Sequence, residues 1–175
     1  MKKNNVYSFE VTNWNEEIIG QFITEGKKWI LIHDNTNDFI LDGYRFIQKV
    51  NIMNIKRGKD EIFKEKIFKL KGFHYLNIDK DYNLNDTIPL LNQIMNDDII
   101  IQYDAEDEED IYVGKFVEIN SDNFRIKSLT TRAEWSSNYL CKFDEISSFS
   151  IKNDYLNSLS LLLENIGDVH RLKIT

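Results

Sequence analysis

The sequence is short of several residues that commonly organise a protein. It has one cysteine and one proline among 175 residues, so no disulfide bond can form within the chain. No apolar run approaches the ~20 residues that a membrane helix needs. The basic start at residues 1–3 is not followed by the apolar segment of a signal peptide. We therefore expect a cytoplasmic protein that makes no membrane contact.

The motifs of common catalytic and cofactor sites are also missing. We find no glycine-rich phosphate loop, no zinc-ligand spacing, no HExxH and no Gly-x-Ser-x-Gly. Cys141 alternates with Tyr139 and Phe143, which favours a small buried hydrophobe over a nucleophile. His33 beside Asp34 fits a general base with an orienting carboxylate, but no nucleophile motif accompanies it. The sequence predicts no enzyme, no cofactor and no metal site.

Charge is unevenly distributed along the chain, whose formal net charge is −7. Residues 1–79 carry 13 Lys or Arg and 11 Asp or Glu, whereas residues 98–175 carry 8 and 15. A net negative charge opposes the binding of a polyanion such as nucleic acid. A protein partner is therefore favoured over a nucleic acid.

The two halves of the chain resemble each other, which predicts an internal duplication. At a shift of 94, residues 6–22 lie on residues 100–116 without a gap, and Phe22 meets Phe116. We expect two one-residue insertions in the second copy, which raise the shift to 95 and then to 96. The matches that follow from these insertions are Trp29 with Phe124, Tyr44 with Tyr139, Val50 with Ile146, Ile55 with Ile151, and residues 73–78 with 169–174.

Alternating apolar residues predict short strands, and changes of period predict helices. In the first copy we expect strands over 6–11, 18–24 and 29–33, with one or two more over 44–55. A helix over 60–71, and another capped by Asp154, should each precede a short closing strand that contains His74 or His170. Between the copies, Asp86 should cap a helix over 87–96 that has Pro89 in its first turn.

Five short strands with a helix are typical of a small barrel. The order of strand, Gly-x-Phe strand, hairpin and Asp/Asn-rich loop, followed by the segment from Tyr139 to Ile151, resembles Sm-like and SH3-like small barrels. Similar uncharacterised bacterial proteins have an Ile-containing strand and a Tyr-led helix, here at Ile146 and Tyr155. The resemblance implies a mainly β protein with helices (α+β), built as two tandem small β-barrel repeats. Their boundaries are 1–79 and 98–175, with a helical linker over 80–97.

Three groups of residues are candidates for binding a partner. Six carboxylates in the seven residues 104–110 indicate a solvated loop, a loose site for a divalent cation or a site for a cationic protein, with Asp107, Glu108 and Glu109 at the centre of the run. Trp14, in the matching loop of the first copy, is either a binding anchor or a lid on its own barrel. Lys56, Arg57 and Lys59 form a basic stretch that is either solvated or phosphate-binding.

Two functions remain open. The first is a non-catalytic, protein-binding module, as a monomer with two similar halves or as a small homo-oligomer. The second is a nucleic-acid-binding protein that uses the basic stretch. The segment Ile55 to Gly58 resembles the Ile-Arg-Gly turn of the Sm family, but the second copy has residues 151–154 with a different sequence. RNA binding is therefore not implied by the resemblance.

Overall fold

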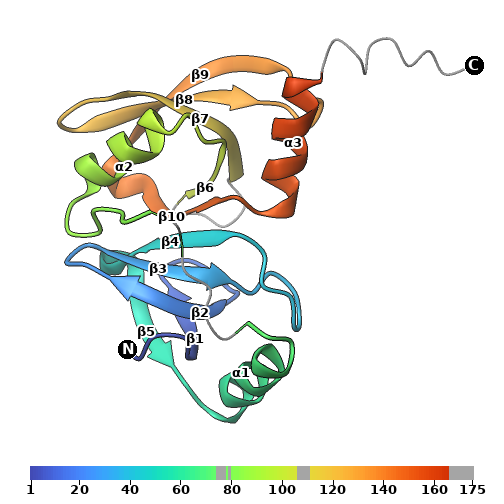
Figure 1. Cartoon of the computed structure of the whole chain (residues 1–175). Coiled ribbons are helices and arrows are strands. Elements are labelled where there is room, and N and C mark those ends of the chain that lie inside the picture. Colours follow the sequence, from blue (N-terminus) through green and yellow to red (C-terminus); the bar gives the residue numbers. More distant parts are fainter. Residues whose placement is uncertain (74–77, 79, 106–110, 166–175) are drawn as a thin grey trace, which may run out of the picture.

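The structure is a computed structural model that describes residues 1–73, 78, 80–105 and 111–165. Within these residues, ten β-strands form one antiparallel sheet, and three α-helices pack around it (Figure 1). None of the helices in this part of the chain combines the length and the apolar character that crossing a membrane requires.

Each half contributes five strands. The first half comprises β1 (Val6–Val11), β2 (Ile18–Glu25), β3 (Trp29–Asp34), β4 (Tyr44–Gln48), β5 (Ile52–Lys56) and α1 (Lys59–Leu70). The second comprises α2 (Thr87–Asn96), β6 (Ile101–Ala105), β7 (Ile111–Ile119), β8 (Asn123–Leu129), β9 (Trp135–Lys142), β10 (Ile146–Ile151) and α3 (Asp154–Glu164). A short 3₁₀ turn precedes β5 and another precedes β10.

The prediction of two tandem small β-barrels is wrong, because the strands form one open sheet in the order β5-β1-β2-β3-β4-β10-β6-β7-β8-β9. A barrel within the first half would close only if β4 paired with β5. Instead β4 pairs with β10 of the other half, and Phe46 lies opposite Phe149. Figure 1 shows these two strands side by side where the halves meet. We call this pairing the seam.

The halves pair their strands in the same order and in the same register. Tyr7 lies opposite Gly20 in the first half and Ile101 lies opposite Gly114 in the second, so both members of the pair recur 94 residues later. A register shift interrupts β2–β3 just after Phe22, and another interrupts β7–β8 just after Phe116. The offset of 94 holds through every pair from β1 to β5.

The predicted insertions are therefore wrong. With a constant offset of 94, Ile30 corresponds to Phe124, Tyr44 to Asn138, and Ile52 to Ile146. The insertions were predicted in order to match aromatic residues with one another. No insertion is present there, because the turns from β2 to β3 and from β7 to β8 have equal lengths. Phe22 and Phe116, which the predicted repeat pairs, are both buried, but Tyr139, which it pairs with Tyr44, is 43% exposed on the outermost strand.

The linker helix agrees with its prediction in both bounds and cap. The side chain of Asp86 accepts a hydrogen bond from the backbone N–H of Thr87, where α2 begins. In α3 the cap is Asn153, one residue before the predicted Asp154, and its Oδ1 accepts from the Leu156 N–H. Both predicted closing strands, with His74 and His170, fall largely or wholly outside the described residues.

The two halves share one hydrophobic core. The rings of Phe46 and Phe149 stack across the seam with centroids 4.6 Å apart. Trp29 and Phe116 meet Phe149 edge-on at 5.5 and 5.9 Å. The buried face of α2 joins the same cluster through Leu90, Leu91 and Ile94. The seam is therefore closed by apolar packing as well as by backbone hydrogen bonds.

Two glycines at equivalent positions allow the strands to approach closely. A Cβ atom on Gly20 would lie 2.6 Å from the carbonyl oxygen of His33, and one on Gly114 would lie 2.1 Å from that of Lys127. We expect Gly114→Ala to destabilise the protein by about 1–3 kcal/mol in urea unfolding, because the backbone must shift. Gly58→Ala, whose Cβ would meet nothing closer than 3.5 Å, is the control. Equal losses in the two variants would contradict this explanation.

Candidate functional site

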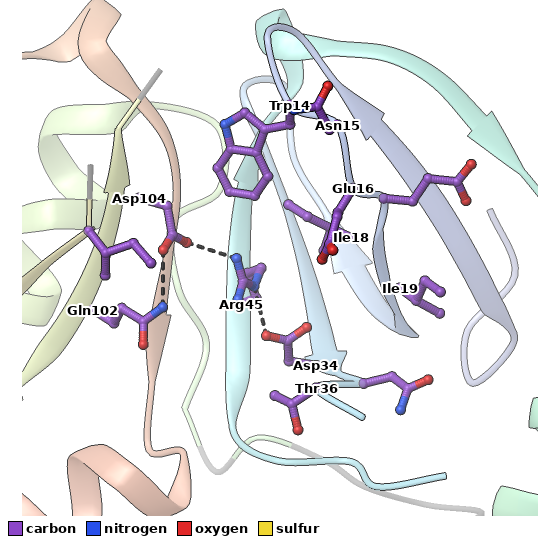
Figure 2. Close-up of a pocket in the computed structure, with 13 residues that line it drawn as sticks. Trp14, Asn15, Glu16, Ile18, Ile19, Asp34, Thr36, Arg45, Gln102 and Asp104 are labelled. Atoms are coloured by element: carbon purple, nitrogen blue, oxygen red, sulfur yellow. Dashed lines mark hydrogen bonds and ion pairs between the residues drawn. The ribbon is translucent and has the colours of Figure 1, made fainter. Parts of the chain in front are cut away.

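A cavity of about 650 Å³ opens where the loop between β1 and β2 faces strands β6 and β7 of the other half. Trp14 lines it from the first half and Gln102 from the second (Figure 2), where Ile111 also belongs to the lining. Asp34, Arg45 and Asp104 belong to the same lining, and we call this cavity the seam pocket. It exists only because the two halves meet.

Arg45 connects the two halves inside this pocket. Its Nε donates to Asp34 Oδ2 at 2.7 Å, and its Nη1 donates to Asp104 Oδ2 at 2.8 Å. Figure 2 shows the guanidinium between these two carboxylates. Ser148 Oγ donates to the same Asp104 oxygen at 2.6 Å, and Gln102 Nε2 donates to the other at 3.1 Å. The ion pairs therefore lie within a connected polar network.

Strand pairing explains why these groups converge. Arg45 lies on β4, opposite Ile32 of β3 on one side and opposite Ser150 of β10 on the other. Asp34 ends β3, and Asp104 lies opposite Ser148 on the next strand beyond β10. The cluster thus spans four adjacent strands, and only the seam brings the last two near the first two.

The pocket is acidic. Asp34 and Asp104 are 4% and 3% exposed and share one guanidinium, so the buried cluster has one excess negative charge when both carboxyls are ionised. Glu16 and Glu17 add carboxylates to the lining, although Glu17 is ion-paired with Lys56. A cation would reduce the excess negative charge of this pocket.

Burial shapes the protonation of the cluster. Burial raises the pKa of the Asp34 carboxyl above its usual value of 3.8, and the attraction of Arg45 offsets this only in part. Asp104 and Asp42 raise the pKa of Asp34 further. Burial opposes the charged form of Arg45, but Asp34 and Asp104 outweigh it and raise the pKa of the guanidinium. Charging Asp34 therefore costs more free energy here than it would in water.

Trp14 forms part of the pocket wall and packs against the buried cluster of the first half. Its side chain is partly buried, which fits either predicted role, the anchor or the lid. The indole Nε1 is buried and has no hydrogen-bond partner within the described part of the chain.

The predicted basic residues do not line this pocket. Lys56 pairs with Glu10 and Glu17, and Arg57 pairs with Glu65 at 2.7 Å. Lys59 is exposed at the start of α1. Two of the three charges are therefore already balanced by carboxylates.

The predicted acidic loop is described only in part. Asp104, its first carboxylate, is buried in the Arg45 network instead of being solvated, because strand β6 extends through it. Asp107, Glu108 and Glu109 lie outside the described residues. The run joins Ala105 at the end of β6 to Ile111 at the start of β7.

His33 and Asp34 do not act as a pair in this structure. Successive residues of a strand point to opposite faces. The His33 ring stacks on Tyr44 with centroids 5.1 Å apart, whereas Asp34 reaches Arg45. Burial lowers the pKa of His33 to about 4, so its imidazole is neutral at neutral pH.

Cys141 is buried, as predicted, and burial followed by the charge of Glu145 raises the pKa of its thiol to about 11. The thiol is therefore protonated at neutral pH. Among the residues described, no three His, Cys, Asp or Glu side chains are grouped so as to hold a metal ion.

Comparisons of the chain with protein-family models, with curated proteins and with solved structures find no match. The resemblance to Sm-like and SH3-like barrels therefore stays a prediction.

Sequence reasoning found Trp14 but missed Arg45, and it assigned other roles to Asp34 and Asp104. One signal was available for Arg45, which lies between the apolar strand residues Tyr44 and Phe46. A charged residue within a predicted strand needs a partner if it is buried. The identity of that partner depended on the seam, which strand patterns do not specify.

Proposed function

We propose that the protein is a non-catalytic, protein-binding module, and that its seam pocket receives a lysine or arginine side chain of a partner protein. The observation that carries this proposal is the composition of the cavity. Four carboxylates and an indole line it: Asp34 and Asp104 share one guanidinium and Glu17 is paired with Lys56, whereas Glu16 has no ion-pair partner among the described residues.

Each part of a basic side chain finds a matching group in the pocket. Asp34 and Glu16 supply negative charge, and the face of Trp14 favours a cation by about 0.5–2 kcal/mol. The aliphatic stem of lysine or arginine suits the side chain of Ile111, which is exposed at the rim.

The constant offset of 94 supports an internal duplication, but the pocket chemistry is not duplicated. The counterparts of Asp34 and Arg45 at this offset are Ser128 and Tyr139. A second pocket of this kind would therefore lack both the central cation and one of its carboxylates. We infer one binding site per chain.

Nucleic-acid binding through the basic stretch has less support. A phosphate would have to displace Glu10 and Glu17 from Lys56, and Glu65 from Arg57. The net charge of −7 also opposes a polyanion. This alternative predicts binding to RNA or DNA that weakens steeply as salt concentration rises.

Titration with short peptides tests the proposal. We expect a peptide with two or three lysines or arginines to bind, and the matched glutamine peptide not to bind, by calorimetry. Glu16→Gln and Trp14→Leu should each weaken binding several-fold, because the first removes a negative charge and the second removes the aromatic face that would contact the cation. Binding should strengthen as pH rises through the raised pKa of Asp34, since its carboxyl then becomes charged.

Glu134→Gln is the matched control, because Glu134 is also exposed but does not line the pocket. Peptide affinity should be unchanged in this variant. Equal weakening by Glu16→Gln and Glu134→Gln would indicate unspecific attraction to an acidic protein. Tight binding of nucleic acid with no binding of basic peptides would favour the alternative.

A further inference from the structure

The two outermost strands, β5 and β9, each have one hydrogen-bonded neighbour among the residues described. Both carry exposed apolar side chains. On β9, Leu140 is 56% exposed, and on β5, Ile55 is 41% exposed. Proteins usually guard such edges with proline, with charged side chains or with a covering element. Residues 135–141 of β9 contain neither proline nor a charged residue.

The strand pairing at the seam indicates which strands these two edges can pair with. At the offset of 94, β9 is the counterpart of β4, and β5 is the counterpart of β10. Phe46 and Phe149, which stack across the seam and are fully buried, therefore correspond to Leu140 and Ile55. The apolar pair that closes the seam inside the chain thus has an exposed equivalent at the two ends of the sheet.

We propose that copies of this chain associate head to tail, with β9 of one copy pairing with β5 of the next copy. The strands run antiparallel, as β4 and β10 do. Leu140 then lies opposite Ile55, and Tyr139 lies opposite Lys56, in the register that the seam gives to Phe46–Phe149 and Arg45–Ser150. The occupant of each edge is a second copy of the same chain.

The contact between copies should be weaker than the seam. Leucine and isoleucine offer less area than two stacked phenylalanines. At the seam the Asn51 side chain donates to the carbonyl oxygen of Ile146 at 2.9 Å. Its counterpart at the offset of 94 is Glu145, whose carboxylate has no hydrogen to donate. We therefore expect association that is reversible and depends on protein concentration.

The geometry also fixes the kind of assembly. The contact joins two different edges, so each added copy leaves one β5 and one β9 free until a ring closes. The mass should therefore increase beyond that of a dimer. A symmetric contact between two β9 strands would stop at the dimer.

Sedimentation velocity on the full chain at increasing concentration tests this assembly. The wild-type protein should form species larger than a dimer. Leu140→Lys, which blocks β9, and Ile55→Lys, which blocks β5, should each remain monomeric. In an equimolar mixture, β5 of the Leu140→Lys variant is free to pair with β9 of the Ile55→Lys variant. The other two edges are blocked, so the mixture should form a dimer and nothing larger.

Leu161→Lys is the control, because Leu161 is also exposed but belongs to helix α3 and not to either edge strand. It should assemble like the wild type, and circular dichroism should show that all three variants fold. A wild-type protein that is monomeric at every concentration would overturn the proposal. So would dimers of either edge variant alone, or no association in their mixture.

Discussion

Replacing Arg45 by methionine is expected to destabilise the protein by about 3–5 kcal/mol at neutral pH, because two buried carboxylates lose their shared cation. Asp34 and Asp104 both bind this guanidinium, and neither is exposed enough for water to replace it. Urea unfolding of the wild type and the variant measures the loss. Methionine keeps most of the side-chain volume, so the comparison isolates the charge.

The loss should depend on pH in a defined direction. The folded-state pKa of Asp34 is raised above 3.8, so its contribution to stability is most favourable at acid pH and is lost as pH rises through that pKa. Without Arg45 this decline is steeper. The difference between wild type and Arg45→Met should therefore shrink at mildly acid pH.

The triple variant Arg45→Met, Asp34→Asn and Asp104→Asn is the control for this explanation. It removes the unpaired charges and should recover part of the lost stability, because a buried ion pair contributes little compared with a neutral replacement. A loss in Arg45→Met that is the same at all pH values, or that the triple variant does not reduce, would mean that packing alone is responsible.

Phe149→Ala should cost about 3–5 kcal/mol of unfolding free energy, the usual loss for a fully buried phenylalanine. Phe149 is 0% exposed and contacts Phe46, Trp29 and Phe116, so its loss opens a cavity at the seam. Both halves border that cavity. We therefore expect them to lose stability together, in one unfolding transition.

Phe63→Ala provides the matched comparison, because Phe63 is exposed on α1 and its ring meets Phe39 edge-on. Its truncation should cost no more than about 1 kcal/mol, as for most surface changes. If Phe149→Ala cost as little, the shared core would be disproved. Two separate unfolding transitions in the wild type would disprove it as well.

Local features of the fold were predictable because local chemistry determines them. Asp86 and Pro89 specify the start of α2 through a cap and a fixed φ, and this helix has the predicted bounds. The gapless match of residues 6–22 with residues 100–116 paired Phe22 with Phe116 correctly. The seam was not predictable, because Phe46 and Phe149 are about a hundred residues apart and the sequence of neither strand specifies which strand it pairs with.

The residues of the candidate site also divide into those that local sequence predicts and those that depend on long-range strand pairing. Trp14 was found because an aromatic residue in a polar loop is unusual in sequence alone. Asp104 was assigned to a solvated acidic loop, since its burial depends on the pairing of β6 with β10. Arg45 acquires its role only when β10 brings Ser148 and Asp104 beside it. The pocket forms only because the two halves meet at the seam, and the proposed function depends on that pocket.

Nuclear Overhauser contacts between backbone Hα atoms test the seam most directly. In an antiparallel pair, alternate opposed residues bring their Cα atoms within about 4.5 Å, close enough for a strong Hα–Hα signal. The structure predicts such signals between β4 and β10, either at Phe46–Phe149 and Tyr44–Ile151 or at the alternate pairs Arg45–Ser150 and Ile47–Ser148. Signals between β4 and β5 of the same half would instead show a closed barrel, and they would contradict the shared sheet and the pocket built on it.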